Sequence, residues 1–303
     1  HERSSAASDV YKRQPLLYTK LQIHPWKYLT KIIYMEDKLI KEIKDDVAYI
    51  WINRPDKKNA LDFDVWFGIP DLIEEIVEKE EARCILLAGK GDAFSAGIDI
   101  TVLMQDMNLN ENLSSTASDR RETMKQIEDL QNAFTRIANS PIPTIALAHG
   151  FCIGGATSMV SACDIRLSTR DAVFSIGETK LGLVADVGIL QRMPKIVSKG
   201  DLRELAFTGR KFDGEHAEKI RFVSNTYENV EELHKAGLEM AKEIASNSKN
   251  IVQGTKEILH KGEDLTTDQA LDFVRLWNTS YLISDDLKEG VIAVSYTHLT
   301  LPT

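Results

Sequence analysis

Residues 149–166 have the sequence HGFCIGGATSMVSACDIR, which is the most informative segment for predicting the fold. The elements it contains or adjoins are a strand (TIALAHG, 144–150), a glycine-rich turn (GFCIGGA, 150–156), a short helix (TSMVSA, 157–162) and a second strand (CDIRLS, 163–168). A helix that begins at Gly155 would direct unpaired backbone N–H groups and its positive end toward a ligand. This unit of strand, turn, helix and strand predicts an α/β protein.

The residues before this stretch predict elements of the same kinds. Two alternating segments around Asp45-Asp46 predict a hairpin over 39–53, and apolar residues on one helical face predict a helix over 65–76. The apolar run CILLAG (84–89) predicts a strand that is covered on both sides. It leads into a second small-residue turn, FSAGID (94–99), in which Asp99 is expected to cap a helix.

The other segments predict a polar loop followed by a mainly helical region. Residues 104–120 are rich in Asn, Ser and Asp and predict a surface loop, and a helix with its apolar stripe over 127–137 is expected to stop at Ser140-Pro141. After the loop 175–188, helices are expected to include 230–244 and 271–283. No long linker interrupts 35–293, so we interpret these residues as one domain with C-terminal helices from about residue 200.

The two ends of the chain are expected to lie outside this domain. Residues 4–14 and 294–303 lack a hydrophobic period and resemble read-through translations of a sequencing adaptor. We therefore interpret residues 1–34 as a non-native or disordered extension, with Met35 as the native start. The tail 294–303 is expected not to continue the helical pattern before it.

Composition excludes several functional classes. The formal net charge of −9 and pI of about 5.4 disfavour a nucleic-acid or membrane-surface partner, and no apolar run approaches the ~18 residues of a membrane helix. The three cysteines are not in metal-binding spacing, so no metal site is expected. These features predict a cytoplasmic protein.

The two small-residue turns suggest the chemistry. Neither FSAGID nor GFCIGGA matches a phosphate-binding loop. Small residues do allow backbone N–H groups to approach a ligand closely. If the two turns converge on one point, they form an oxyanion hole for an enolate or alkoxide.

Three blocks of the sequence resemble one known family. NRPDKKNAL (53–61), AFSAGIDI (93–100) and residues 149–166 are similar to the signature blocks of the crotonase superfamily, which comprises enoyl-CoA hydratases and isomerases. The resemblance covers 35–293 and implies an α/β spiral of repeated strand-strand-helix units with a helical C-terminal region. It implies oxyanion-hole amides at Ala96 and Gly155. The neighbouring positions implied to contact the substrate are Gly97, Ile98 and Gly154.

Further segments resemble one branch of that family. Residues 174–190, with LAFTGRK (205–211) and LWNTS (276–280), look most like the dienoyl-CoA isomerases, which convert 3,5-dienoyl-CoA to 2,4-dienoyl-CoA. The resemblance implies an acyl-CoA thioester substrate, in which coenzyme A is part of the substrate rather than a separate cofactor. It also implies a homotrimer or homohexamer.

Acidic residues distinguish the reactions of the family. The family's hydratases use acids at the positions that match 158 and 178; here these are Ser158 and Glu178, so hydration is disfavoured. Dienoyl isomerases use the acids that match Glu178 and Asp186. We expect Asp186 to remove a proton from C2 and Glu178 to protonate C6. Apolar neighbours that are expected to raise the pKa of both acids are Ile176, Leu181, Leu183 and Val184.

Ser158 also leaves two alternatives open, because dienoyl isomerases of the family usually carry an acid at this position. A simple isomerase that converts 3-enoyl-CoA to 2-enoyl-CoA needs mainly the acid that matches Glu178. A catalytically silent acyl-CoA-binding protein is the alternative of another class. Ser158 is therefore a candidate tuning position.

Overall fold

Six strands form the main sheet, in the order β1-β2-β3-β4-β6-β9. The computed structural model describes residues 38–102 and 116–299, with side chains as far as residue 292. The strands are β1 (Leu39–Lys44), β2 (Val47–Ile52), β3 (Cys84–Gly89), β4 (Thr144–Ala148), β6 (Ile165–Thr169) and β9 (Asn225–Tyr227). The predicted hairpin is confirmed, because β1 and β2 pair antiparallel around Asp45-Asp46, whereas the other neighbours pair in parallel.

A second sheet has three short strands. It consists of β5 (Phe151–Ile153), β7 (Val173–Ser175) and β8 (Phe212–Asp213), with β7 in the centre. β5 pairs with β7 in parallel, and β7 pairs with β8 antiparallel. The turn predicted at residues 150–156 therefore contains a strand, since Phe151–Ile153 extends along β7 before helix α5 begins.

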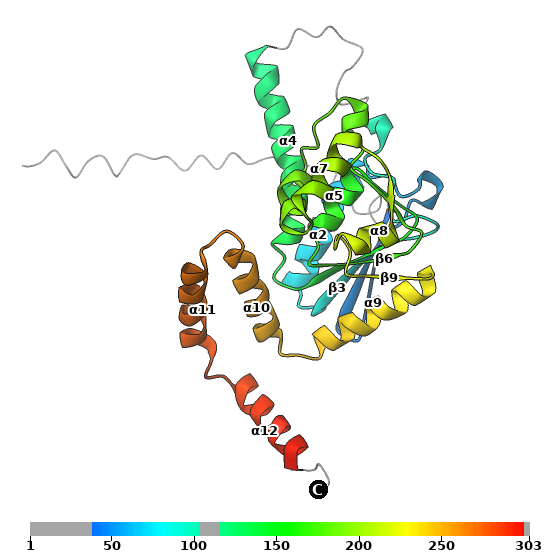
Figure 1. Cartoon of the computed structure of the whole chain (residues 1–303). Helices are drawn as coiled ribbons and strands as arrows, with labels where there is room; N and C mark the ends of the chain where they lie inside the picture. Colours follow the sequence, from blue (N-terminus) through cyan, green and yellow to red (C-terminus); the bar gives the residue numbers. More distant parts are fainter. Residues whose placement is uncertain (1–37, 103–115, 300–303) are drawn as a thin grey trace, which may run out of the picture. The chain divides into compact units, whose positions relative to one another are not determined.

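Helices alternate with these strands and then dominate the second half of the chain (Figure 1). The α-helices are α2 (Phe63–Glu78), α4 (Ala117–Ala138), α5 (Gly155–Ser161), α6 (Ile189–Arg192), α7 (Lys199–Thr208), α8 (Gly214–Lys219), α9 (Val230–Ala245), α10 (Lys249–Gly262), α11 (Thr267–Tyr281) and α12 (Asp285–Leu299). The 3-10 turns are η1 (Pro55–Lys57), η2 (Glu178–Leu181) and η3 (Met193–Lys195).

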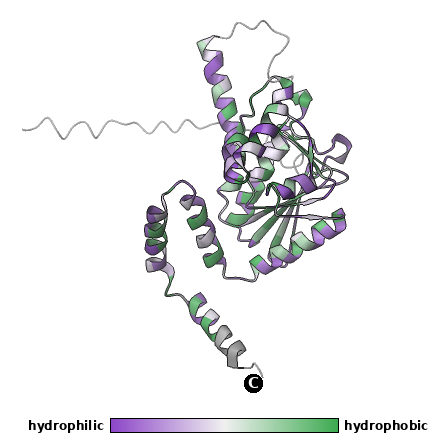
Figure 2. Ribbon diagram, in the orientation of Figure 1, coloured by the Kyte–Doolittle hydropathy of each residue, from purple (hydrophilic) through white to green (hydrophobic). Residues whose placement is uncertain are grey.

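Hydrophobic residues cover both faces of the main sheet, and Figure 2 shows them gathered along its strands. Successive side chains of a strand point to opposite faces. On β3, Ile85 and Leu87 join the core beneath α2, α4 and α5, whereas Leu86 and Ala88 join the core beneath α9. Every residue of β3 is buried, which confirms the prediction of a strand covered on both sides.

Two predicted boundaries are wrong. The surface loop predicted over 104–120 extends too far, because α4 begins at Ala117 with Thr116 as its cap; residues 103–115 lie outside the described residues, as do residues 1–37. Helix α12 runs to Leu299, so the tail does continue the helical pattern that was expected to stop before Val294. No proline or glycine occurs between Gly290 and Pro302, so the sequence offers the helix no break there. Among the described helices, none is both long and apolar enough to cross a membrane.

A group of aromatic side chains joins α9 to the sheet. The ring of His234 on α9 lies 5.1 Å from that of Trp51 and 6.4 Å from that of His149, and Tyr49 stacks on Trp51. Lys90 lies over the Trp51 ring, 3.6 Å from its centroid. Burial, together with the nearby His149 and Lys90, lowers the pKa of His234 to about 4.

We predict that the pH dependence of stability reports on His234. Its pKa is about 4 in the folded protein and 6.5 when unperturbed, so only the unfolded state takes up its proton between these values. The free energy of unfolding should therefore fall as the pH falls from 6.5 toward 4. In urea denaturation across this pH range, the free energy of unfolding should fall less in His234→Phe than in the wild type. His260→Phe, at an exposed position on α10, should show the same fall as the wild type. An unchanged pH dependence in His234→Phe would show that this residue is not responsible.

Candidate functional site

Two loops lie side by side where the chain leaves β3 and β4. Ser95 pairs with Cys152 in an isolated parallel bridge. The Ser95 N–H donates to the Phe151 carbonyl at 2.8 Å, and the Ile153 N–H donates to the Ser95 carbonyl at 3.2 Å. The two small-residue turns therefore converge, as the sequence predicts.

The convergence leaves two backbone amides available, but one of them is not the predicted one. The Ala96 N–H donates to the Lys58 carbonyl at 2.9 Å, so the prediction that Ala96 is an oxyanion donor is wrong: its hydrogen is already used. The Ile98 nitrogen lies 3.9 Å from where a Cβ on Gly155 would be. Within residues 38–102 and 116–299, neither the Ile98 N–H nor the Gly155 N–H has an acceptor. The candidate donor pair is therefore Ile98 with Gly155.

Tight packing explains why glycine occupies two of these positions. Gly97 has a φ of +89°, and a Cβ there would collide with the Ile153 carbonyl. A Cβ on Gly155 would lie 2.9 Å from the ring of Trp66 on α2. Trp66 cannot easily retreat, because its Nε1 donates to the Leu130 carbonyl at 3.1 Å and its ring stacks on Phe134 of α4. The positions of both amides are thus set by backbone and ring contacts.

The Glu178 carboxyl group lies next to this amide pair. Glu178 begins η2, and its Oε1 is 3.4 Å from where a Cβ on Gly154 would be. Its Oε2 is buried and has no hydrogen-bond partner in the described part of the chain. Burial raises the pKa of Glu178, as the sequence predicts; its own backbone N–H opposes this effect, and the charge of Asp186 raises the pKa further. A carboxyl group with a raised pKa, beside two free amides, is suited to proton transfer.

Asp186 lies within electrostatic range of Glu178 but in a more open environment. Its side chain is exposed, and its backbone carbonyl accepts from Gln131 Nε2 at 2.6 Å. The expectation that apolar neighbours enclose both acids is wrong here: within this loop Leu181, Leu183 and Val184 are exposed by 63%, 40% and 78%. The two predicted acids are close to each other, but only Glu178 is desolvated by the protein itself.

Ser158 occupies a buried position on α5, three residues after Gly155. It is fully buried, and its Oγ has no hydrogen-bond partner among the described residues. Its backbone N–H donates to the Gly154 carbonyl at 3.0 Å, which holds it one helical turn beyond the amide pair. The position therefore offers a hydroxyl group, and no carboxyl group, to anything bound beside it.

A cavity of about 1300 Å³ lies next to these groups rather than over them. Asp186 lines it together with Arg192 and, from α10, Lys256 and Leu259; neither Glu178 nor Gly155 does. The described residues contain no group of three or more His, Cys, Asp or Glu that could hold a metal ion. The three cysteines are buried and unpaired, and burial raises the pKa of each of their thiols.

Comparison with known proteins identifies relatives of this chain. The profile of the enoyl-CoA hydratase/isomerase family matches residues 42–297. A peroxisomal Delta(3,5)-Delta(2,4)-dienoyl-CoA isomerase of Arabidopsis thaliana is 36% identical over 84% of this chain and 91% of its own length. The mitochondrial protein of that name from Dictyostelium discoideum is 38% identical over 89% of each chain. Since these relatives are named peroxisomal and mitochondrial, the cytoplasmic location of this chain stays a prediction.

Solved structures show the same fold. An enoyl-CoA hydratase subunit from Geobacillus kaustophilus superimposes with a TM-score of 0.76 at 25% identity, over 88% of this chain and 97% of that one. An enoyl-CoA hydratase from Bacillus anthracis gives 0.75 at 25% identity, over 86% and 96%. The predicted α/β spiral with a helical C-terminal region is therefore confirmed.

Substitution of Gly155 tests how tightly the amide pair is packed. We predict that Gly155→Ala lowers the free energy of unfolding by about 1–3 kcal/mol, because the new methyl group forces Trp66 to shift. Gly290→Ala is the control, since outside its own stretch of helix no atom of the described residues lies within 4 Å of its new Cβ. Denaturant melts give the free energy of unfolding of both variants. Equal stability of the two would contradict the tight contact between Trp66 and Gly155.

Proposed function

We propose that this chain, which belongs to the enoyl-CoA hydratase/isomerase family, converts 3,5-dienoyl-CoA to 2,4-dienoyl-CoA. The observation that carries the proposal is the desolvated Glu178 carboxyl group beside the free amides of Ile98 and Gly155. Relatives at 33–38% identity that are named as isomerases of this kind support it. We assign the activity to residues 35–293.

The two amides would stabilise the charge that develops during the reaction. Removal of a proton from C2 moves negative charge onto the thioester oxygen. That oxygen would accept hydrogen bonds from the Ile98 and Gly155 N–H groups. Gly155 is also the first residue of α5, so this end of the helix presents further unpaired N–H groups.

We propose the order of the two acids that the resemblance implies. Burial and the charge of Asp186 raise the pKa of Glu178, which favours the protonated form that can deliver a proton, whereas Asp186 is exposed. We therefore propose that Asp186 removes the C2 proton and that Glu178 protonates C6.

This assignment gives a balanced reaction. The Asp186 carboxylate takes the C2 proton, and the electrons of that C–H bond form the enolate. The double bonds at C3 and C5 then move to C2 and C4 as the Glu178 carboxylic acid delivers a proton to C6. No water is added and nothing is oxidised, and the two acids return to their starting states by proton exchange with solvent.

Ser158 supports an isomerase over a hydratase. Addition of water needs two groups that hold and deprotonate that water, and position 158 supplies only a buried hydroxyl group. The exposure of Asp186 favours a second candidate, an isomerase that converts 3-enoyl-CoA to 2-enoyl-CoA with Glu178 alone. A silent acyl-CoA-binding protein is the remaining alternative, and turnover decides between them.

The C-terminal helices support our proposal of a homo-oligomer, either a trimer or a hexamer. Helix α11 contains no buried residue, although its sequence has an apolar face. Exposed apolar residues on α11 and after it include Leu271, Leu276, Tyr281, Leu282 and Ile283. Contact with another copy would remove these side chains from water.

Two acid substitutions test the mechanism. The protein is offered 3,5-dienoyl-CoA, 3-enoyl-CoA and 2-enoyl-CoA in parallel, and product formation is followed by absorbance and chromatography. We predict dienoyl turnover that falls at least ~100-fold in both Glu178→Gln and Asp186→Asn, since each lacks one proton-transfer group. Glu215→Gln, an exposed acid at the start of α8, should retain wild-type rates.

Each other outcome has a definite meaning. Turnover of 3-enoyl-CoA alone, lost only in Glu178→Gln, would establish the simpler isomerase instead. Rapid hydration of 2-enoyl-CoA would contradict the role given to Ser158. A folded protein that binds acyl-CoA and turns over none of the three substrates would be a silent binder.

Substitution of Ser158 tests its role in reaction choice. Ser158→Asp supplies a carboxyl group at the position where the resemblance implies that hydratases carry an acid, so we predict measurable hydration of 2-enoyl-CoA and a lower isomerase rate. Ser161→Ala, which alters a buried hydroxyl on the same helix, controls for packing effects. If Ser158→Asp changes neither rate, position 158 does not tune the reaction.

A further inference from the structure

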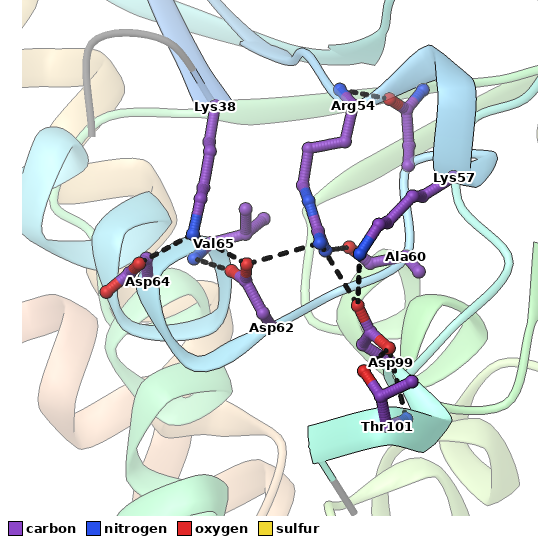
Figure 3. Close-up of polar contacts among 10 residues, drawn as sticks. Lys38, Arg54, Lys57, Ala60, Asp62, Asp64, Val65, Asp99 and Thr101 are labelled. Carbon is purple, nitrogen blue, oxygen red and sulfur yellow. Dashed lines mark hydrogen bonds and ion pairs between the residues drawn. The ribbon is translucent and has the colours of Figure 1, made fainter. Parts of the chain in front are cut away.

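The Arg54 guanidinium lies between two aspartates from different loops (Figure 3). Its Nη2 is 3.0 Å from Asp99 Oδ2 and 3.4 Å from Asp62 Oδ2. The three side chains are only 10%, 9% and 12% exposed. Ion pairs this well shielded from water fix geometry more firmly than surface pairs do.

Asp99 connects this guanidinium to one of the two free amides, because it directly follows Ile98. The Asp99 N–H donates to the Leu61 carbonyl at 2.9 Å, and the Leu61 N–H donates to the Gly97 carbonyl at 2.8 Å. These bonds hold the peptide groups on both sides of Ile98. The Asp99 carboxylate also caps the following turn, as predicted, by accepting from the Thr101 N–H at 3.1 Å.

Asp62 connects the same guanidinium to the other amide. It is the N-cap of α2, where its Oδ1 accepts from the Val65 N–H at 3.1 Å. Its backbone carbonyl accepts from the Trp66 N–H at 2.8 Å. The Trp66 ring is the group that packs against Gly155. A shift at the start of α2 would therefore reach the Gly155 amide.

Arg54 is itself held firmly. Its backbone N–H donates to Asn59 Oδ1 at 2.7 Å, and its Nη1 donates to the Ala60 carbonyl. Asn59 is fully buried, and its Nδ2 donates to the carbonyls of Lys90 and Ala93 at 2.8 and 2.6 Å. These bonds anchor the loop that carries Arg54 to the segment directly after β3.

The two aspartates depend on Arg54 to different degrees. Asp62 also pairs with Lys38, at 2.7 Å. Apart from Arg54, Asp99 has only Lys57 as a cation within ion-pair distance in the described residues, at 3.9 Å and with a half-exposed side chain. The hydrogen bond from Thr101 lowers the pKa of Asp99, and Arg54 lowers it further, so the carboxylate stays charged. Loss of Arg54 would leave this charge poorly compensated, so the Ile98 loop should move first.

We infer that Arg54 is a positioning residue that sets the spacing of the Ile98 and Gly155 amides by bridging Asp99 and Asp62. The inference rests on the proposed function, since it assumes that these amides stabilise an enolate. Arg54 touches neither amide and acts through the two aspartates. Its removal should weaken stabilisation of the enolate more than binding of the substrate.

The test combines kinetics with a spectroscopic readout. Arg54→Gln should lower kcat about 10- to 100-fold and change KM by less than about threefold, because misplaced amides act mainly in the transition state. Acetoacetyl-CoA is the spectroscopic probe: its C2 proton is acidic, and its enolate absorbs in the near ultraviolet. At a fixed pH, the bound enolate fraction should fall in Arg54→Gln and less so in Arg54→Lys.

A matched control separates positioning from stability. Arg166→Gln removes another largely buried guanidinium, which donates to the Cys163 and Phe222 carbonyls at 2.7 Å. It should lower the melting temperature without changing kcat or the enolate fraction. If Arg54→Gln does not fold, Asp99→Asn decides instead, because it removes the charge and keeps the size; it should shift both readouts as Arg54→Gln does.

Failure of the inference and failure of the proposed function look different. If the wild type isomerises dienoyl-CoA while folded Arg54→Gln keeps kcat and enolate fraction within about twofold, the role of Arg54 is overturned and the function stands. If the wild type forms the enolate but isomerises no dienoyl-CoA, the function falls. The positioning role of Arg54 is still supported in that case if the Arg54 variants show a lower bound enolate fraction than the wild type. A wild type that forms no enolate overturns the inference.

Discussion

Two backbone N–H groups that find no acceptor among the described residues, those of Ile98 and Gly155, impose the constraint to which the surrounding residues conform. Unsatisfied donors at a protein interior are costly unless a ligand or water accepts from them. Here two such donors are neighbours, and close contacts surround both of them. Gly97 is wedged against the Ile153 carbonyl, and Gly155 is pressed against Trp66. An anionic oxygen is the ligand that such a pair of donors fits best.

Two acidic side chains near this pair of amides differ in their surroundings. On one side, Glu178 is desolvated beside Gly154, with a raised pKa that suits a group that gains and loses a proton. On the other side, Asp99 is kept charged by Thr101 and Arg54 and is therefore suited to holding a loop in place. The same residue type can serve chemistry or architecture, and its surroundings decide which.

Local patterns were enough to predict most elements of the fold, because each depends on residues close together in sequence. The alternating residues around Asp45-Asp46 predicted the hairpin, and the apolar run 84–89 predicted a doubly covered strand. The free amide at Ile98 could not be found this way. Whether the Ala96 or the Ile98 N–H is left without an acceptor depends on backbone hydrogen bonds to Lys58 and Leu61, which lie more than 35 positions earlier in the chain. The packing of Trp66 on Gly155 spans an even longer separation.

The positions at which the substrate loses and gains protons reveal whether Glu178 and Asp186 act as proposed. The protein is incubated with 3,5-dienoyl-CoA in deuterium oxide, and the 2,4-dienoyl-CoA product is analysed by proton NMR. We predict deuterium at C6 of the product, with one hydrogen lost from C2, and neither change in Glu178→Gln. A 2,5-dienoyl-CoA product that carries deuterium at C4 and none at C6 would place the second proton transfer at C4 and contradict the roles of Glu178 and Asp186.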